Sequence, residues 1–121
     1  ESVAGDHVND CLFCKIGSGQ IPAKVVLQDD EVLAFDDINP QAPVHVLVIP
    51  KRHVAHLNDA GAGDQALLGR LLETAALVAR KKGVADAGYR VVANQGRDGG
   101  QTVLHLHLHV LGGRSMAWPP G

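Results

Sequence analysis

The 121-residue sequence is poor in aromatic residues and nearly balanced in charge. It has two phenylalanines, one tyrosine and one tryptophan, and its formal net charge is −2. So few aromatic side chains argue against a surface that stacks the bases of single-stranded nucleic acid. The absence of a basic stripe also argues against tight binding to a phosphate backbone, so we expect no nucleic-acid partner.

Long apolar segments and abundant cysteine are also absent. The longest apolar run, VLVIP at residues 46–50, is far shorter than the roughly 20 residues of a membrane-spanning helix. No signal-peptide pattern opens the chain, so we expect a cytoplasmic protein without a membrane partner. The only two cysteines, Cys11 and Cys14 in CLFC, are too few for a disulfide framework. They form half of a metal site, a redox pair or two idle thiols.

The length and the ordinary globular composition predict one domain with a single core. Residues 1–10 are polar and acidic without periodicity, and we expect a flexible arm there, followed by a single domain over residues 11–121. CLFCKIG at residues 11–17 predicts a short helical turn that glycines end. The remaining apolar, β-branched segments predict strands within residues 23–28, 31–38, 42–50, 89–94 and 103–111.

From Asp64 onward the hydrophobic pattern changes its period. Apolar residues recur at helical spacing, and Gly83 suits the position just past a helix end because it follows the basic turn RKK. The residues with this spacing are Leu68, Leu71, Leu72, Ala75, Ala76 and Ala79. One long helix and several strands joined by turns predict an α+β fold with an antiparallel-leaning sheet.

Three of the seven histidines alternate with aliphatic residues in VLHLHLHVL, residues 103–111. On a strand, His105, His107 and His109 would share one face, with about 6.5–7 Å between neighbours and about 13 Å between the outer two. Metal–nitrogen bonds are only about 2 Å long. Two neighbouring histidines could therefore share one ion, but all three on a regular strand could not.

A glycine-rich segment, GRDGGQT at residues 96–102, comes directly before these histidines. Glycines let main-chain N–H groups approach an anion closely, so a phosphate near Gly99, Gly100 and Thr102 would lie beside the imidazoles. A neutral imidazole can attack phosphorus, and a second one can donate a proton to the leaving group. The pattern predicts transfer through a covalent phosphohistidine, with no cofactor in the chemical step.

The segment HLHLHVL fits the His-φ-His-φ-His-φ-φ signature, and the chain resembles the histidine triad (HIT) superfamily of nucleotide hydrolases and transferases. IPAKVV, LAFDDINPQAPVHVLVIPKRHV, GYRVVANQGRDGGQTVLHLHLHVLGGR and WPPG resemble its Hint branch, the histidine triad nucleotide-binding proteins. The resemblance covers nearly everything from Phe13 to Gly121. It implies a HIT-like α+β fold with one long helix and a short N-terminal helix. It also implies a homodimer whose two sheets join, and hydrolysis of purine nucleoside 5′-phosphoramidates such as AMP-amine and AMP-lysine conjugates.

The resemblance also assigns roles to individual residues. His107 matches the nucleophile that forms a nucleotidyl-histidine, and His109 matches the histidine beside the phosphate and the leaving group. His45 and His105 match supporting histidines, and Asp37 matches the residue that holds the ribose hydroxyls. The positions that this resemblance predicts to contact the nucleotide are Leu12, Phe13, Ile16, Ile21, Phe35, Asp37, Ile38, Asn39, Asn94, Gly100, Gln101, Thr102, His107, His109 and Trp118.

In some histidine triad proteins a Cys-x-x-Cys pair helps to bind zinc. A closed structural zinc site needs four ligands, and Cys11 and Cys14 supply two. His53 and His105 are the candidates for the other two, which would leave the rest of the triad for chemistry. The readings as idle thiols or as a redox pair stay open.

Trp118 matches a tail aromatic that reaches toward the partner subunit's site.

Other functions stay open on the sequence. One alternative is hydrolysis of dinucleoside polyphosphates, and another is a purine-nucleotide-binding regulatory module whose catalysis is incidental. Removal of adenylate from DNA is disfavoured because no basic patch or zinc finger accompanies the motif. Asn39 and Thr102 stand where relatives often have serine, so both keep a hydrogen-bonding group. His7 and His56 match no catalytic position, and we expect them in the tail and on the solvated surface.

Overall fold

The computed structural model describes residues 10–121, so His7 and all but the last residue of the expected N-terminal arm lie outside the described residues. Five strands form one antiparallel sheet in the order β1-β2-β3-β5-β4. The strands are β1 (Val25–Gln28), β2 (Val32–Asp36), β3 (Val44–Pro50), β4 (Tyr89–Val92) and β5 (Leu108–Gly112). The helices are α1 (Leu12–Gly17), α2 (Gln65–Lys81) and α3 (Gly96–Gly99), with 3₁₀ turns η2 (Leu57–Asp59) and η3 (Ala62–Asp64). The predicted α+β fold is confirmed.

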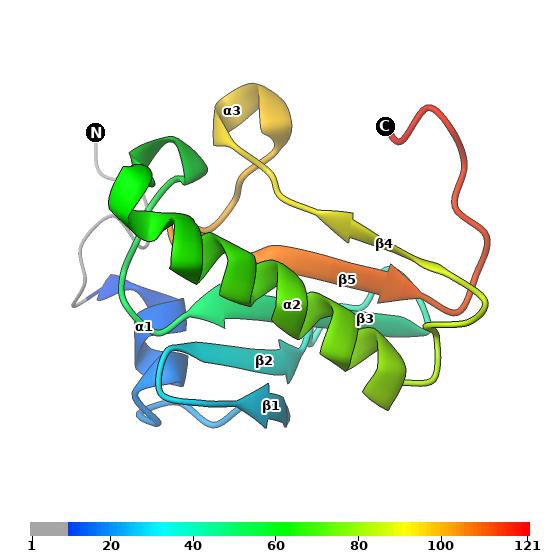
Figure 1. Ribbon diagram of the computed structural model, residues 1–121, viewed down its shortest axis with the longest axis horizontal. Coiled ribbons are helices and arrows are strands. Elements are labelled where there is room, and N and C mark those ends of the chain that lie inside the picture. Colours follow the sequence, from blue (N-terminus) through cyan, green and yellow to red (C-terminus); the bar gives the residue numbers. More distant parts are fainter. Residues whose placement is uncertain (1–9) are drawn as a thin grey trace.

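The long helix α2 runs diagonally across one face of the sheet (Figure 1). Its buried residues recur at helical spacing and include Leu71, Ala75 and Ala79 of the predicted set, but Leu72 is 58 % exposed. Gly83 follows the helix with a φ of 78°, as expected for a residue just past a helix end. Among residues 10–121, no helix combines the length and the apolar character that crossing a membrane requires.

The central strand β3 is buried on both faces, which explains why every residue of VHVLVIP except His45 is apolar. Val46 and Val48 belong to the core beneath α2, whereas Leu47 and Ile49 belong to a second apolar cluster on the opposite face. That second cluster contains Phe13 from α1. The short N-terminal helix therefore covers the face of the sheet that α2 leaves free.

The histidine segment departs from the predicted strand. β5 begins only at Leu108, so the expectation that His105 and His107 lie on a regular strand is wrong. The partner strand β3 ends at Pro50, which has no N–H for a ladder, and the Pro50 carbonyl accepts a hydrogen bond from the ring Nε2 of His105 instead (2.7 Å). The glycine-rich segment 96–102 contains the short helix α3.

Candidate active site

A cleft of about 1250 Å³ opens over the sheet face that carries α1. Most of the predicted site residues line it. The apolar ones are Leu12, Phe13, Ile16, Ile21, Phe35 and Ile38. The polar ones are Asp37, Asn39, His45, Thr102, His107 and His109. The rings of Phe13 and Phe35 meet edge to face with their centroids 5.6 Å apart, so the apolar part of the cleft has a rigid aromatic wall.

The ring of His107 is held in one orientation at this cleft. Its Nδ1 lies 2.7 Å from the main-chain carbonyl oxygen of His105, and a carbonyl can only accept, so Nδ1 carries the proton. The edge of Phe13 packs at the same ring, with centroids 5.2 Å apart. Burial lowers the pKa of His107, although the hydrogen bond to the His105 carbonyl opposes this. The neutral ring therefore keeps a lone pair on Nε2.

His45 and His109 form a hydrogen-bonded pair beside His107. His45 Nε2 lies 2.9 Å from His109 Nδ1, and the ring centroids of His107 and His109 are 5.0 Å apart. Burial and the neighbouring imidazoles of His107 and His45 lower the pKa of His109 to about 4. Burial also lowers the pKa of His45, and the nearby carboxylate of Asp37 opposes that shift. At neutral pH these rings are uncharged, so each has one N–H donor and one acceptor nitrogen.

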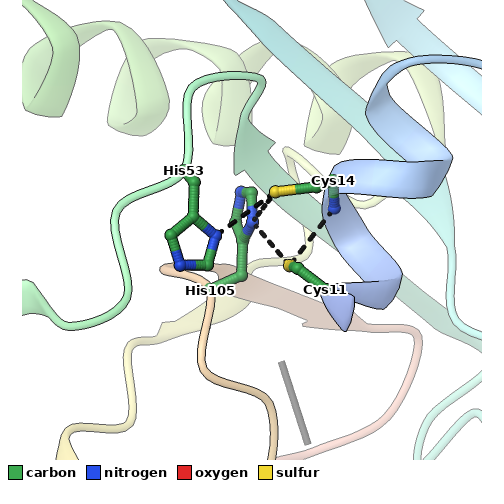
Figure 2. Close-up of side chains that lie close together, drawn as sticks. All are labelled: Cys11, Cys14, His53 and His105. Atoms are coloured by element: carbon green, nitrogen blue, oxygen red, sulfur yellow. Dashed lines mark hydrogen bonds between the residues drawn. The ribbon is translucent and has the colours of Figure 1, made fainter. Parts of the chain in front are cut away.

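Four side chains that could bind a metal converge just before the histidine segment enters the sheet (Figure 2). Cys11 Sγ lies 3.2 Å from His105 Nδ1, and Cys14 Sγ lies 3.2 Å from His53 Nδ1 and 3.5 Å from His105 Nδ1. In a tetrahedral zinc site with usual bond lengths, sulfur and nitrogen ligands stand about 3.5 Å apart. The two thiols and two imidazoles fit zinc in chemistry and in spacing.

The surroundings of this cluster also favour a metal site over a redox pair. His105 Nε2 donates to the Pro50 carbonyl, which leaves Nδ1 unprotonated and directed at the two sulfurs. Burial lowers the pKa of His105 to about 4, so the ring is available as a neutral ligand. Burial and the neighbouring Cys11 raise the pKa of Cys14 to about 12, whereas reactive redox thiols have lowered pKa values.

His105 joins the cysteine cluster to the cleft. Its ring lies among the sulfurs, and its main-chain carbonyl accepts from the ring of His107. The helix α1 makes the same connection, because Cys11 and Cys14 flank Phe13, whose ring packs against His105 and His107. Any ion bound by the cluster would thus brace both the nucleophile candidate and one wall of the cleft.

Four predicted nucleotide contacts do not line the cleft: Asn94, Gly100, Gln101 and Trp118. The amide of Gln101 donates to the Ala55 carbonyl (2.8 Å) and accepts from the Gly96 N–H (3.0 Å), so it ties the glycine-rich segment to a neighbouring loop. It also bonds His56 (3.1 Å), which is half-buried, so the expectation that His56 is a solvated surface residue is wrong. Trp118 is 82 % exposed.

Several residues that line the cleft were not predicted from the sequence. Lys82 comes from the end of α2, where it looked like part of a basic last turn, and its Nζ pairs with Asp36 Oδ1 (3.0 Å). Gln41 also lines the cleft, and its main-chain N–H donates to His45 Nδ1 (3.0 Å). Lys82 belongs to no motif, and although Gln41 lies within the segment LAFDDINPQAPVHVLVIPKRHV, no role was assigned to it there. Only the pairing of distant segments brings both residues to the cleft.

The sheet with its single long helix, together with a His-φ-His-φ-His segment beside a cleft, defines the histidine triad class of α+β proteins. The HIT domain family matches residues 18–116, and the chain belongs to this family. It is 57 % identical over 112 residues to a HIT-like protein of Synechococcus elongatus, which covers 93 % of this chain and 97 % of that protein.

Solved structures give the same result. The fold matches a HIT family hydrolase from Legionella pneumophila with a TM-score of 0.90 and 54 % identity, covering 92 % of this chain and 99 % of that one. It matches a histidine triad protein from Clostridium difficile with a TM-score of 0.86 and 44 % identity, covering 89 % of this chain and 94 % of that one.

The low pKa of His109 predicts that the fold loses stability as the pH falls below neutral. The pKa of His109 is 6.5 in the unfolded chain and about 4 in the folded protein. Between these pH values the unfolded chain is protonated at His109 and the folded protein is not. The stabilisation is complete above pH 6.5 and is lost as the pH falls toward about 4. We expect the free energy of unfolding, measured by urea denaturation, to fall between pH 7 and pH 5 by about 1 kcal/mol more in the wild type than in His109→Gln. Equal slopes would contradict this assignment.

Proposed function

We propose that this protein is a purine nucleoside 5′-phosphoramidate hydrolase of the Hint branch. The observation that carries the proposal is the orientation of His107, whose Nδ1 is bound to a carbonyl while Nε2 keeps its lone pair in a cleft with aromatic walls. The similarity to a Legionella protein named as a HIT family hydrolase supports hydrolysis as the reaction class.

The chemistry needs two histidines in different roles. His107 Nε2 attacks the phosphorus of the phosphoramidate, and the P–N bond breaks as a P–N bond to His107 forms. An amine leaves poorly as an anion, so the departing nitrogen takes a proton from His109, whose protonated form the negative charge of the bound phosphate stabilises. A water molecule then attacks the nucleotidyl-histidine and passes a proton to His109. The products are a free amine and a nucleoside monophosphate, and both histidines return to their starting state.

The cleft has the features needed to hold the nucleotide. We propose that the purine lies against the apolar wall around Phe13 and Phe35, and that Asp37 holds the ribose hydroxyls. Asp37 Oδ1 already accepts the Asn39 N–H (2.9 Å), which fixes the carboxylate at the cleft. The phosphate would lie beside Thr102. Asn94, Gly100 and Gln101 do not line the cleft, and we propose that they support the phosphate segment from behind.

We further propose that Cys11, Cys14, His53 and His105 bind one structural zinc ion, and that no cofactor enters the chemical step. Such an ion would cross-link α1, the segment after β3 and the segment before β5. It would leave His107 and His109 for the reaction.

A homodimer with joined sheets is part of the proposal. Strand β4 lies at an edge of the sheet, and Arg90 on it donates to the Ala117 carbonyl of the C-terminal tail (2.8 Å). A dimer joined at this edge would carry the exposed Trp118 toward the partner subunit's cleft. We place the protein in the cytoplasm.

A substrate panel tests the function directly. We expect AMP-amine and AMP-lysine conjugates to be hydrolysed with a higher kcat/KM than diadenosine polyphosphates at matched concentrations, because the site provides a proton for a leaving amine. Faster cleavage of the polyphosphates would show that the substrate class is wrong. AMP binding without turnover of any of these compounds would favour the regulatory binding module.

A further inference from the structure

We propose that the main-chain N–H of Gln41 is a positioning group for the proton donor of the site. It sets the tautomer of His45 and, through His45, places the proton of His109 on Nε2, the ring nitrogen that remains for the cleft. The catalytic meaning of this inference rests on the proposed function, but the proton positions themselves do not.

The contact between Gln41 and His45 sets the tautomer of His45. A main-chain N–H can only donate, and that of Gln41 lies 3.0 Å from His45 Nδ1. His45 must therefore accept at Nδ1, and a neutral ring then carries its single proton on Nε2. In the opposite tautomer two N–H groups would face each other in a half-buried place, and both would lose their hydrogen bond.

The tautomer of His45 in turn determines that of His109. His45 Nε2 lies 2.9 Å from His109 Nδ1, so a proton on the first nitrogen makes the second an acceptor. His109 then carries its own proton on Nε2. Asp37 Oδ2 lies 3.4 Å from His45 Nε2, and because a carboxylate also accepts from this position, it favours the same tautomer. Gln41 and Asp37 thus act on His45 in the same direction from opposite ends of the ring.

The segment that directly follows β5 holds Gln41 in place. Arg114 Nε donates to the Gln41 carbonyl oxygen (3.2 Å), so the peptide units on both sides of this residue are bound. Gly113 lets the chain after β5 pass close to the segment that contains Gln41 and Pro43. Its φ is 89°, and a Cβ on it would lie 2.9 Å from the Cβ of Pro43. Both residues directly follow β5, the strand that carries His109. One continuous segment therefore carries the proton donor and clamps the group that sets its tautomer.

Nitrogen-15 NMR of histidine-labelled protein tests the inference without any substrate. The protonated and unprotonated ring nitrogens of a neutral histidine have well-separated chemical shifts, so each tautomer is read directly. In the wild type we expect His45 and His109 both to carry the proton on Nε2. A proton on Nδ1 of either ring would overturn the inference.

Two substitutions at Gln41 separate the main chain from the side chain. Gln41→Pro removes the N–H, and we expect His45 to populate the Nδ1-protonated tautomer while kcat falls about tenfold to a hundredfold, with a much smaller change in KM. Gln41→Ala keeps the N–H, and we expect both tautomers to stay as in the wild type. A folded Gln41→Pro protein with unchanged tautomers would overturn the inference.

Arg114 provides a second route if Gln41→Pro does not fold. We expect Arg114→Ala to shift part of the His45 population to the other tautomer and to lower kcat severalfold, and Arg114→Lys to restore most of both. Arg80→Ala, which removes an exposed arginine at the end of α2, should change neither. Identical spectra and kcat in Arg114→Ala and Arg80→Ala would overturn the clamp. If the tautomers are as expected but no phosphoramidate is cleaved, the proposed function fails and this inference stands.

Discussion

Replacing His107 with alanine should lower kcat for an AMP-amine substrate by about 10⁴-fold or more, because the variant loses the atom that forms the covalent intermediate. The neighbouring imidazole of His109 cannot substitute for it. His109 Nδ1 is bound to His45, and the carbonyl of His105 orients only the ring of His107. Steady-state kinetics with purified protein measures the loss.

Two further measurements keep this prediction specific. The variant should keep its circular dichroism spectrum and bind AMP within about threefold of the wild type, since His107 is only one part of the cleft. Wild-type protein quenched during turnover should carry a nucleotidyl group on His107, as peptide mass spectrometry would show. More than a tenth of the wild-type kcat in His107→Ala, or an adduct on another residue, would rule out the nucleophile assignment.

Removing zinc should produce the largest loss of stability. We expect about one equivalent of zinc per chain in protein purified without chelator, and a chelator should lower Tm by about 10 °C or more, since metal binding to a folded site adds directly to folding stability. Cys11 is fully buried and accepts the Cys14 N–H at the start of α1 (3.3 Å), so loss of the ion would loosen this helix as well. Elemental analysis and thermal unfolding give the two quantities.

The double variant Cys11→Ala/Cys14→Ala is the matched control for the chelator. Its Tm should already be low and should not change when the chelator is added, which separates metal removal from any other effect of the reagent. Metal loss should also slow turnover, because His105 holds His107 through its carbonyl. Less than a tenth of an equivalent of zinc would rule the site out and leave the two thiols without a metal.

Much of the fold followed from local patterns. The helical period in residues 64–83 predicted α2 closely, and the apolar, β-branched segment 42–50 predicted the strand β3. The apolar segments 23–28 and 31–38 predicted β1 and β2, which pair as a hairpin where Asp29 accepts the N–H groups of Glu31 and Val32. The residue pattern of each of these elements repeats every few residues, so it can be recognised without knowing the rest of the molecule.

The histidine segment was the clearest failure of that reasoning. Strict alternation predicted a strand from residue 103, but the ladder begins only at Leu108. The alternation of faces still held, since Leu106, Leu108 and Val110 all pack in the core beneath α2. Alternation reports which side each side chain occupies, and it does not report whether a partner strand is there to pair with the main chain.

The sequence by itself determined the class of fold, the histidine triad motif and the four residues able to hold zinc. Only the tertiary structure decided which atoms meet. It brings Cys11 to His105 across 94 positions and His45 to His109 across 64, and it turns Gln101 away from the cleft. The physical reason is the distance along the chain over which each effect acts. The residue pattern of a segment reflects how that segment packs locally. A ligand set or a tautomer depends on contacts between distant segments, which only the pairing of β3 with β5 and the docking of α1 bring together.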